Sequence, residues 1–143
     1  MTLALILQAK GRDVVTASPH QTLRETAETL DRRNIGAIIV VDAEEKVCGI
    51  VSERDIIRAV ARNKLTVLDD PVSDHMTSRV ETATEETSVL EAMERMTAGR
   101  FRHLPVTKGN RLKGVVSIGD LVKYRISEME HENKAMLEYI TTV

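Results

Sequence analysis

The heptapeptide GIVSERD at residues 49–55 returns as GVVSIGD at residues 114–120, an offset of 65 (120 − 55). Two upstream stretches return in the same order at an offset of 66 (82 − 16): IGAIIV at 35–40 as FRHLPV at 101–106, and VTAS at 15–18 as ETAT at 81–84. An ordered set of segments that occurs twice indicates a structural repeat, and such a repeat sets the architecture of the chain. We therefore expect two equivalent folding units.

Each copy is predicted to follow the pattern β-α-β-β-α. A short strand precedes a helix whose apolar face recurs at i, i+4 and i+7 in both copies: Leu23, Ala27 and Leu30, then Val89, Met93 and Met96. Two β-rich runs follow at residues 37–41 and 47–51, separated by a polar connection of hairpin length. The unbroken apolar run at 38–41 indicates a strand that is covered on both faces.

The second helix of each unit is predicted to begin at Ser52 and at Ser117. An aspartate follows three residues after each serine, which matches the capping-box pattern at a helix start. We divide the chain into a helical extension at 1–13 that ends near Gly11, unit one at 14–70, unit two at 71–125 and a C-terminal helix at 126–143. Because each unit has too little core to stand alone, the two should pack about a pseudo-twofold axis as one α/β (α+β) module.

The composition excludes several classes of protein. Lys and Arg number 20 against 22 Asp and Glu, so the net charge of -2 offers no field that attracts a polyanion, which disfavours nucleic acid as a partner. No apolar run approaches the ~20 residues of a membrane helix, and the apolar stretch at residues 3–7 lacks a basic flank and is too short for the h-region of a signal peptide. The single Cys48 cannot form an internal disulfide, which fits a reducing compartment and a cytoplasmic location.

Catalytic and metal-binding motifs are not found in the sequence. There is no Gly-x-Ser-x-Gly elbow, no Gly-x-x-x-x-Gly-Lys loop and no His-Glu-x-x-His helix. His20, His75 and His131 are scattered without the spacing of metal ligands. We therefore expect a protein that is not an enzyme, with no catalytic cofactor and no metal site.

The ordered set resembles a tandem pair of CBS domains, often called a Bateman module. It runs from V-x-T through IGAIIVVD and GIVSERD to DHMT at 74–77, FRHLPV and GVVSIGD, and covers about residues 8–125. The resemblance implies a disk-like body with a cleft between the units and up to two sites for adenosine compounds such as AMP, ADP, ATP, NAD or S-adenosylmethionine. It further implies a homodimer and a regulatory role on an effector protein in trans. The alternative is a structural interaction module with vestigial ligand sites.

A ribose presents two vicinal hydroxyls, and one carboxylate offers two acceptor oxygens, so Asp55 and Asp120 are the candidate ribose ligands. Arg102 and His103 can donate to phosphate, so the Asp120 site is expected to prefer the more anionic ligand. The positions that match the family's binding segments are Thr16, Ile35, Gly36, Ala37, Ile38, Val51, Ser52, Arg54 and Asp55 in unit one, and Thr82, Phe101, Arg102, His103, Leu104, Pro105, Val116, Ser117, Gly119 and Asp120 in unit two.

Each of these assignments has a purely structural alternative. Ser-x-x-Asp is also a helix cap, and Thr16 and Thr82 are β-branched residues that favour strands. Arg54 can reach a phosphate, pair with Glu53 or face solvent. In unit one, Gly36 and Ala37 are small enough to let a flat base approach closely.

The C-terminal segment carries an apolar pattern of its own. Ile126, Met129, Asn133, Met136 and Ile140 recur at spacings of 3, 4, 3 and 4, which is the seam of a short coiled coil with Asn at one core position. The alternative is a helix that lies on the surface of its own module.

Overall fold

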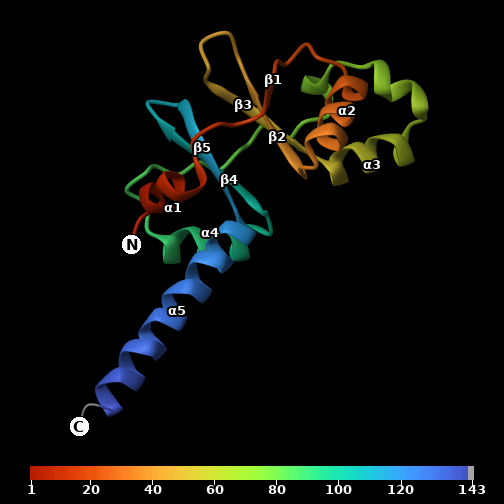
Figure 1. Ribbon diagram of the computed structural model, residues 1–143. Helices are drawn as coiled ribbons and strands as arrows, with labels where there is room; N and C mark the ends of the chain where they lie inside the picture. Colours follow the sequence, from red (N-terminus) through yellow and green to blue (C-terminus); the bar gives the residue numbers. More distant parts are fainter. Residues whose placement is uncertain (142–143) are drawn as a thin grey trace.

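The computed structural model describes residues 1–141 and shows the two repeated units one after the other (Figure 1). Unit one comprises β1 (Thr16–Ala17), α2 (Leu23–Arg33), β2 (Ala37–Val41), β3 (Val47–Ser52) and α3 (Glu53–Arg62). Unit two comprises α4 (Val89–Gly99), β4 (His103–Lys108), β5 (Arg111–Ser117) and α5 (Ile118–Thr141). Helix α1 (Leu3–Lys10) precedes both units, and the short 3-10 helices η1 (Leu65–Asp69) and η2 (Val72–Asp74) lie between α3 and α4. The predicted mixed fold, with a small sheet in each unit, is confirmed; positions 142–143 of the predicted C-terminal helix lie outside the described residues.

The two sheets differ in their first strand. In unit one, β1 pairs in parallel with β2, which pairs antiparallel with β3. In unit two, β4 and β5 form the hairpin, but the expected first strand is reduced to a single parallel bridge between Ala83 and Val106. Pro105 holds the position equivalent to Ile39 (39 + 66 = 105) and has no N–H to donate to the ladder. The pairing therefore stops after one bridge.

The first helix of each unit turns a slightly different face to the core than the sequence pattern indicates. The buried positions are Leu23, Thr26 and Leu30 in α2, and Val89, Ala92 and Met96 in α4. The predicted Ala27 and Met93 are only half-buried. Burial of Thr26 is tolerated because its hydroxyl donates to the Thr22 carbonyl at 2.9 Å.

Strand β2 is covered on both faces, as predicted, since Ile38, Ile39 and Val40 are at most 2% exposed. The hydrophobic core falls into two clusters, one for each unit. Segments outside the two sheets complete these cores. Leu3, Ile6 and Leu7 of α1 join the cluster of unit two, and Val67 and Val72 from η1 and η2 join that of unit one.

The two hairpins meet at equivalent positions, where Lys46 bridges Arg111 (46 + 65 = 111). The Val47 N–H donates to the Asn110 carbonyl at 3.3 Å, and the Leu112 N–H donates to the Glu45 carbonyl at 3.1 Å. The offset of 65 takes Val47 to Leu112 and Glu45 to Asn110, so a twofold rotation exchanges the two hydrogen bonds. The predicted pseudo-twofold axis therefore passes between the β2–β3 and β4–β5 turns.

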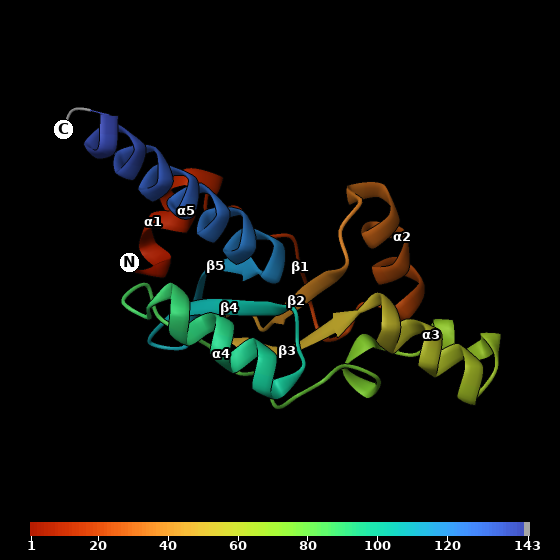
Figure 2. The ribbon, with the colours of Figure 1, turned by 90° about the horizontal axis from the view of Figure 1, so that it is seen from below.

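Helix α5 runs 24 residues and buries only Leu121. From Arg125 to Thr141 its side chains are exposed, apart from half-buried Glu128, and the helix projects away from the module in both views (Figures 1 and 2). The alternative in which this helix lies on its own module is therefore wrong for residues 125–141. At the other end of the chain, α1 stops as predicted at Gly11, whose φ of 98° suits glycine. No helix within residues 1–141 combines the length and apolar character needed to cross a membrane.

Candidate functional site

A cleft of about 310 Å³ opens between the two units. Its walls come from the end of α1 and the segment after it, from β2 and the residues just before it, and from the hairpin of unit two; they are Lys10, Asp13, Val14, Val15, Ile35, Gly36, Ala37, Ile39, His103, Val115 and Ser117. The volume is at the lower end of the range of small-molecule sites. Mostly apolar walls with a few polar groups are typical of a site for a small organic molecule.

The cleft combines the two units in a way that the repeat did not indicate. The repeat predicts Gly36 and Ala37 in one site, and His103 and Ser117 in the other. The structure brings these four residues to a single cleft. The side chains of Glu53 and His103 pack close to Gly36, where an added Cβ would lie 3.1 Å from Glu53 Oε1 and 3.9 Å from His103 Cε1.

Both Ser-x-x-Asp pairs form the predicted helix caps. At α5, the Ser117 N–H donates to Asp120 Oδ2 at 2.8 Å, and the Asp120 N–H donates to Ser117 Oγ at 3.1 Å. At α3, the corresponding distances are 2.9 Å from the Ser52 N–H to Asp55 Oδ2 and 3.3 Å from the Asp55 N–H to Ser52 Oγ. Capping is therefore a role of all four residues, and it holds both carboxylates in place.

Asp120 differs from Asp55 by one additional partner, the ammonium of Lys10. Lys10 Nζ lies 2.6 Å from Asp120 Oδ2 and also donates to the Val115 carbonyl at 3.0 Å. Burial alone would raise the pKa of Asp120, but the hydrogen bonds from Lys10 and from the Ser117 N–H lower that pKa below its ordinary value. Under the repeat offset the counterpart of Lys10 is Met76 (10 + 66 = 76), and among residues 1–141 no ion pair reaches Asp55.

His103 contributes a half-buried imidazole to the cleft and lies opposite Ser117 in the β4–β5 ladder. Burial, followed by the positive charge of Lys10, lowers the pKa of His103 below its ordinary value. A neutral imidazole offers one donor and one acceptor to a ligand. Arg102, its predicted companion, is exposed and is not part of the cleft wall; its carbonyl accepts from the Ile118 N–H at 2.8 Å.

Several predicted positions are core residues. Ile38, Val51, Leu104 and Val116 are at most 1% exposed, Pro105 is also buried, and none of the five lines the cleft. Phe101 packs against the core of unit two. Arg54 and Gly119 are exposed in the first turns of α3 and α5, and the Thr82 carbonyl accepts from Arg95 at 2.8 Å.

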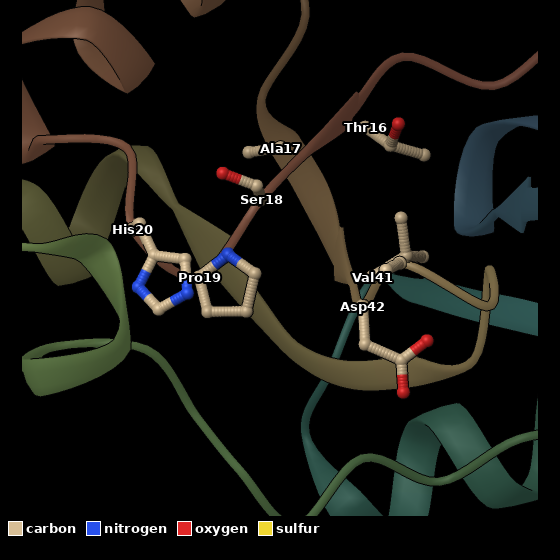
Figure 3. A pocket seen from close by; sticks show the side chains of 8 residues that line it. Thr16, Ala17, Ser18, Pro19, His20, Val41 and Asp42 are labelled. Carbon is tan, nitrogen blue, oxygen red and sulfur yellow. The ribbon is translucent and has the colours of Figure 1, made fainter.

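Thr16 lies outside the cleft and lines a different pocket of about 370 Å³. The other residues of that pocket are Ala17, Ser18, Pro19, His20, Val41, Asp42 and Ala43, and Figure 3 shows Thr16 and His20 on opposite sides of the group. The Asp42 carboxylate accepts from the backbone N–H groups of Glu44 and Lys46 at 2.8 and 3.0 Å, so it serves the β2–β3 turn. Within residues 1–141 no group of His, Cys, Asp and Glu side chains has the arrangement of a metal site.

Sequence reasoning missed Lys10, the last residue of α1, and Asp13, Val14 and Val15 after it, all of which line the cleft. Repetition could not reveal Lys10, because its counterpart is Met76. A signal was nevertheless present: Lys10 is the last residue before the helix-terminating Gly11, where a cation also complements the helix dipole.

Comparison with known proteins places this architecture in a family. A family model described as the CBS domain matches residues 10–62 and 72–127. The chain belongs to the CBS-domain family. A CBS-domain protein from Agrobacterium tumefaciens is 44% identical, with a TM-score of 0.82 over 87% of this chain and 92% of that one. This CBS pair thus shares its fold and nearly half of its aligned sequence with a solved structure.

Two further CBS structures were solved with adenosine compounds. A CBS-domain protein from Pyrobaculum aerophilum, complexed with AMP, is 31% identical, with a TM-score of 0.75 over 84% of this chain and 89% of that one. A CBS-domain pair in complex with 5-methylthioadenosine and S-adenosyl-L-methionine is 27% identical, with a TM-score of 0.77 over 87% of this chain and 98% of that one. These two related CBS proteins therefore bind AMP in one case, and 5-methylthioadenosine and S-adenosyl-L-methionine in the other.

Proposed function

We propose that this CBS pair is a non-catalytic sensor that binds an adenine nucleotide in the cleft between its units. The observation that carries the proposal is the Asp120 carboxylate, which the cap with Ser117 holds in place and which the cleft residues Ser117 and Lys10 contact. Related CBS proteins bound to AMP and to S-adenosyl-L-methionine support the choice of ligand class.

In this proposal each part of an adenosine ligand has its own partners in the cleft or, for Asp120, beside the cleft residues Lys10 and Ser117. Val14, Val15 and Ile39 offer apolar contact to the base, while Gly36 and Ala37 leave room for its flat ring. Asp120 accepts hydrogen bonds from the ribose hydroxyls, and His103 donates to the phosphate side or to the base. The candidate ligands are AMP, ADP, ATP and NAD.

The signalling part of the proposal concerns partners. The protein acts in the cytoplasm on an effector protein in trans, without chemistry of its own, and works as a homodimer. Support for the homodimer comes from α5, where Ile126, Met129, Met136 and Ile140 are 48–62% exposed along one seam. A helix with this pattern gains stability when a second apolar helix covers it.

Calorimetric titration with AMP, ADP, ATP and NAD tests the proposal, together with mass spectrometry of small molecules released from the gently denatured protein. We expect at least one nucleotide to bind, to raise the melting temperature and to be recovered chemically intact after incubation. Conversion of ATP or NAD faster than the uncatalysed background would overturn the sensor function.

The second candidate is a structural interaction module. It is favoured by one observation: both aspartates are already used as helix caps, a role that needs no ligand. If no nucleotide binds or raises the melting temperature, and none is released on denaturation, this second candidate holds.

A further inference from the structure

The two oxygens of Asp120 are unequally used. Oδ2 accepts both from the Ser117 N–H at 2.8 Å and from Lys10 Nζ at 2.6 Å, whereas Oδ1 has no hydrogen-bond partner among residues 1–141. One carboxylate oxygen offers about two lone-pair sites, so Oδ2 is fully occupied. A ribose diol that binds one carboxylate through both hydroxyls needs both oxygens. Bidentate binding therefore requires Lys10 to leave Oδ2.

We propose that Lys10 competes with the ribose for Asp120 and thereby makes this cleft select adenosine ligands that carry a phosphate. The inference rests on the proposed function and identifies the residue that sets its ligand preference. A nucleoside that displaces Lys10 breaks an ion pair and offers the ammonium no anion in return. A nucleotide breaks the same ion pair but presents its phosphate as the new partner.

The fold keeps the displaced ammonium close to the ligand. Lys10 ends α1, which Leu3, Ile6 and Leu7 anchor in the core of unit two. The Lys10 side chain is 34% exposed, so it can swing without unfolding the helix. Asp13 also lines the cleft and adds negative charge, which makes a nearby cation necessary for a phosphate to enter.

Unit one provides an internal comparison. Asp55 has the same cap as Asp120, with Ser52 in place of Ser117, but the position equivalent to Lys10 is Met76. Asp55 Oδ2 accepts from the Ser52 N–H at 2.9 Å and from the Ser52 hydroxyl at 3.1 Å, so its own cap occupies this oxygen and no cation among residues 1–141 pairs with it. By this reasoning any selection for phosphate belongs to the Asp120 cleft alone.

The test compares two variants that both carry Asp55→Asn, which leaves Asp120 as the remaining carboxylate: one keeps Lys10 and the other also carries Lys10→Met. Each is titrated calorimetrically with adenosine and with AMP. Removal of the competitor should tighten adenosine binding about two- to fivefold, the range of a partly exposed ion pair. The preference for AMP over adenosine should fall about tenfold, because the phosphate loses a charge-assisted hydrogen bond. Lys123→Met, an exposed lysine on α5, is the matched control and should change neither value.

Salt provides a second readout with opposite signs. In the protein with Lys10, added salt should tighten adenosine binding, because it weakens the ion pair, and should weaken AMP binding. In Lys10→Met the salt effect on adenosine should vanish. If AMP binds wild type but its preference over adenosine is unchanged in Lys10→Met, this inference is wrong while the proposed function stands. If neither ligand binds any variant, both fail together.

Discussion

Leu7 packs directly over Gly114, and the Leu7 Cδ2 atom lies 2.7 Å from the point where a Cβ on residue 114 would stand. Through this contact α1 packs against β5, and a helix from the N-terminal end of the chain completes the core of unit two. Only a glycine at this point lets the helix lie so close to the strand.

Gly114→Ala should therefore destabilise the fold by about 1–3 kcal/mol, since the added methyl must push Leu7 out of its packed position. Urea unfolding measures this change. Gly119→Ala is the control: its Cβ would meet only Ser117 Oγ at 3.6 Å, and alanine in a helix gains about 0.5–1 kcal/mol over glycine. Equal stability of Gly114→Ala and wild type would show that α1 does not pack on β5 as described.

Asp120→Asn should weaken nucleotide binding by about 1.5–3 kcal/mol, because an amide replaces a charged acceptor. The free energy of unfolding should fall by less than about 1 kcal/mol, because Asn also caps helices and the Lys10 ion pair is partly screened by solvent. Calorimetry with AMP and urea unfolding give the two values. Asp55→Asn probes the other carboxylate in the same way. Unchanged nucleotide affinity in both variants, with normal melting, would leave capping as their only role.

His103 should make the stability of the protein depend on pH near neutrality. Its folded-state pKa is lowered by burial and by Lys10 and Arg102, against the opposing influence of Asp120 and Glu53. The unfolded chain thus binds a proton near pH ~6.5 that the folded protein does not bind, so the free energy of unfolding rises with pH through this window.

Urea unfolding between about pH 7.5 and about pH 5.5 checks this dependence. His103→Asn should flatten the curve in that range. His131→Asn, which alters an exposed residue of α5, should reproduce the slope of wild type. A His103→Asn curve as steep as that of wild type would show that another group causes the dependence.

Sedimentation at micromolar concentration should give twice the chain mass of 15.9 kDa. Met136→Glu places a charge on the exposed seam of α5 and should shift the protein toward monomer, whereas Ala135→Glu on the neighbouring face of the helix should not. A dimer that survives Met136→Glu would move the interface to another surface.

The sequence predicted most of the fold because the repeat reports the same elements twice. Strands β2 and β3, the caps at Ser52 and Ser117 and the stop at Gly11 were all readable from local patterns. The shortened first strand of unit two was not predicted, although its cause is the single residue Pro105. The helix face was placed one residue off because Thr26, a polar residue, is buried with its hydroxyl satisfied by the backbone.

The cleft was harder to predict than the fold. Comparison of one copy with the other groups residues by unit, whereas the cleft takes Gly36 from one unit and Ser117 from the other. A repeat also conceals whatever occurs only once, and Lys10 is such a residue. Its contact with Asp120 depends on the packing of α1 against unit two, and a local sequence pattern does not predict such a long-range contact.

Helix α1 lies before unit one in the sequence but packs into the core of unit two. The boundary between the repeats in the sequence therefore does not separate two bodies in space. A fragment that ended at residue 70 would retain α1 without the core that α1 covers, and a fragment that began at residue 71 would leave Leu104 and Val116 without Leu3, Ile6 and Leu7. Half of this protein is therefore not a portable module. The smallest piece that can be excised, duplicated or fused elsewhere with its cores intact is the pair together with the helix in front of it.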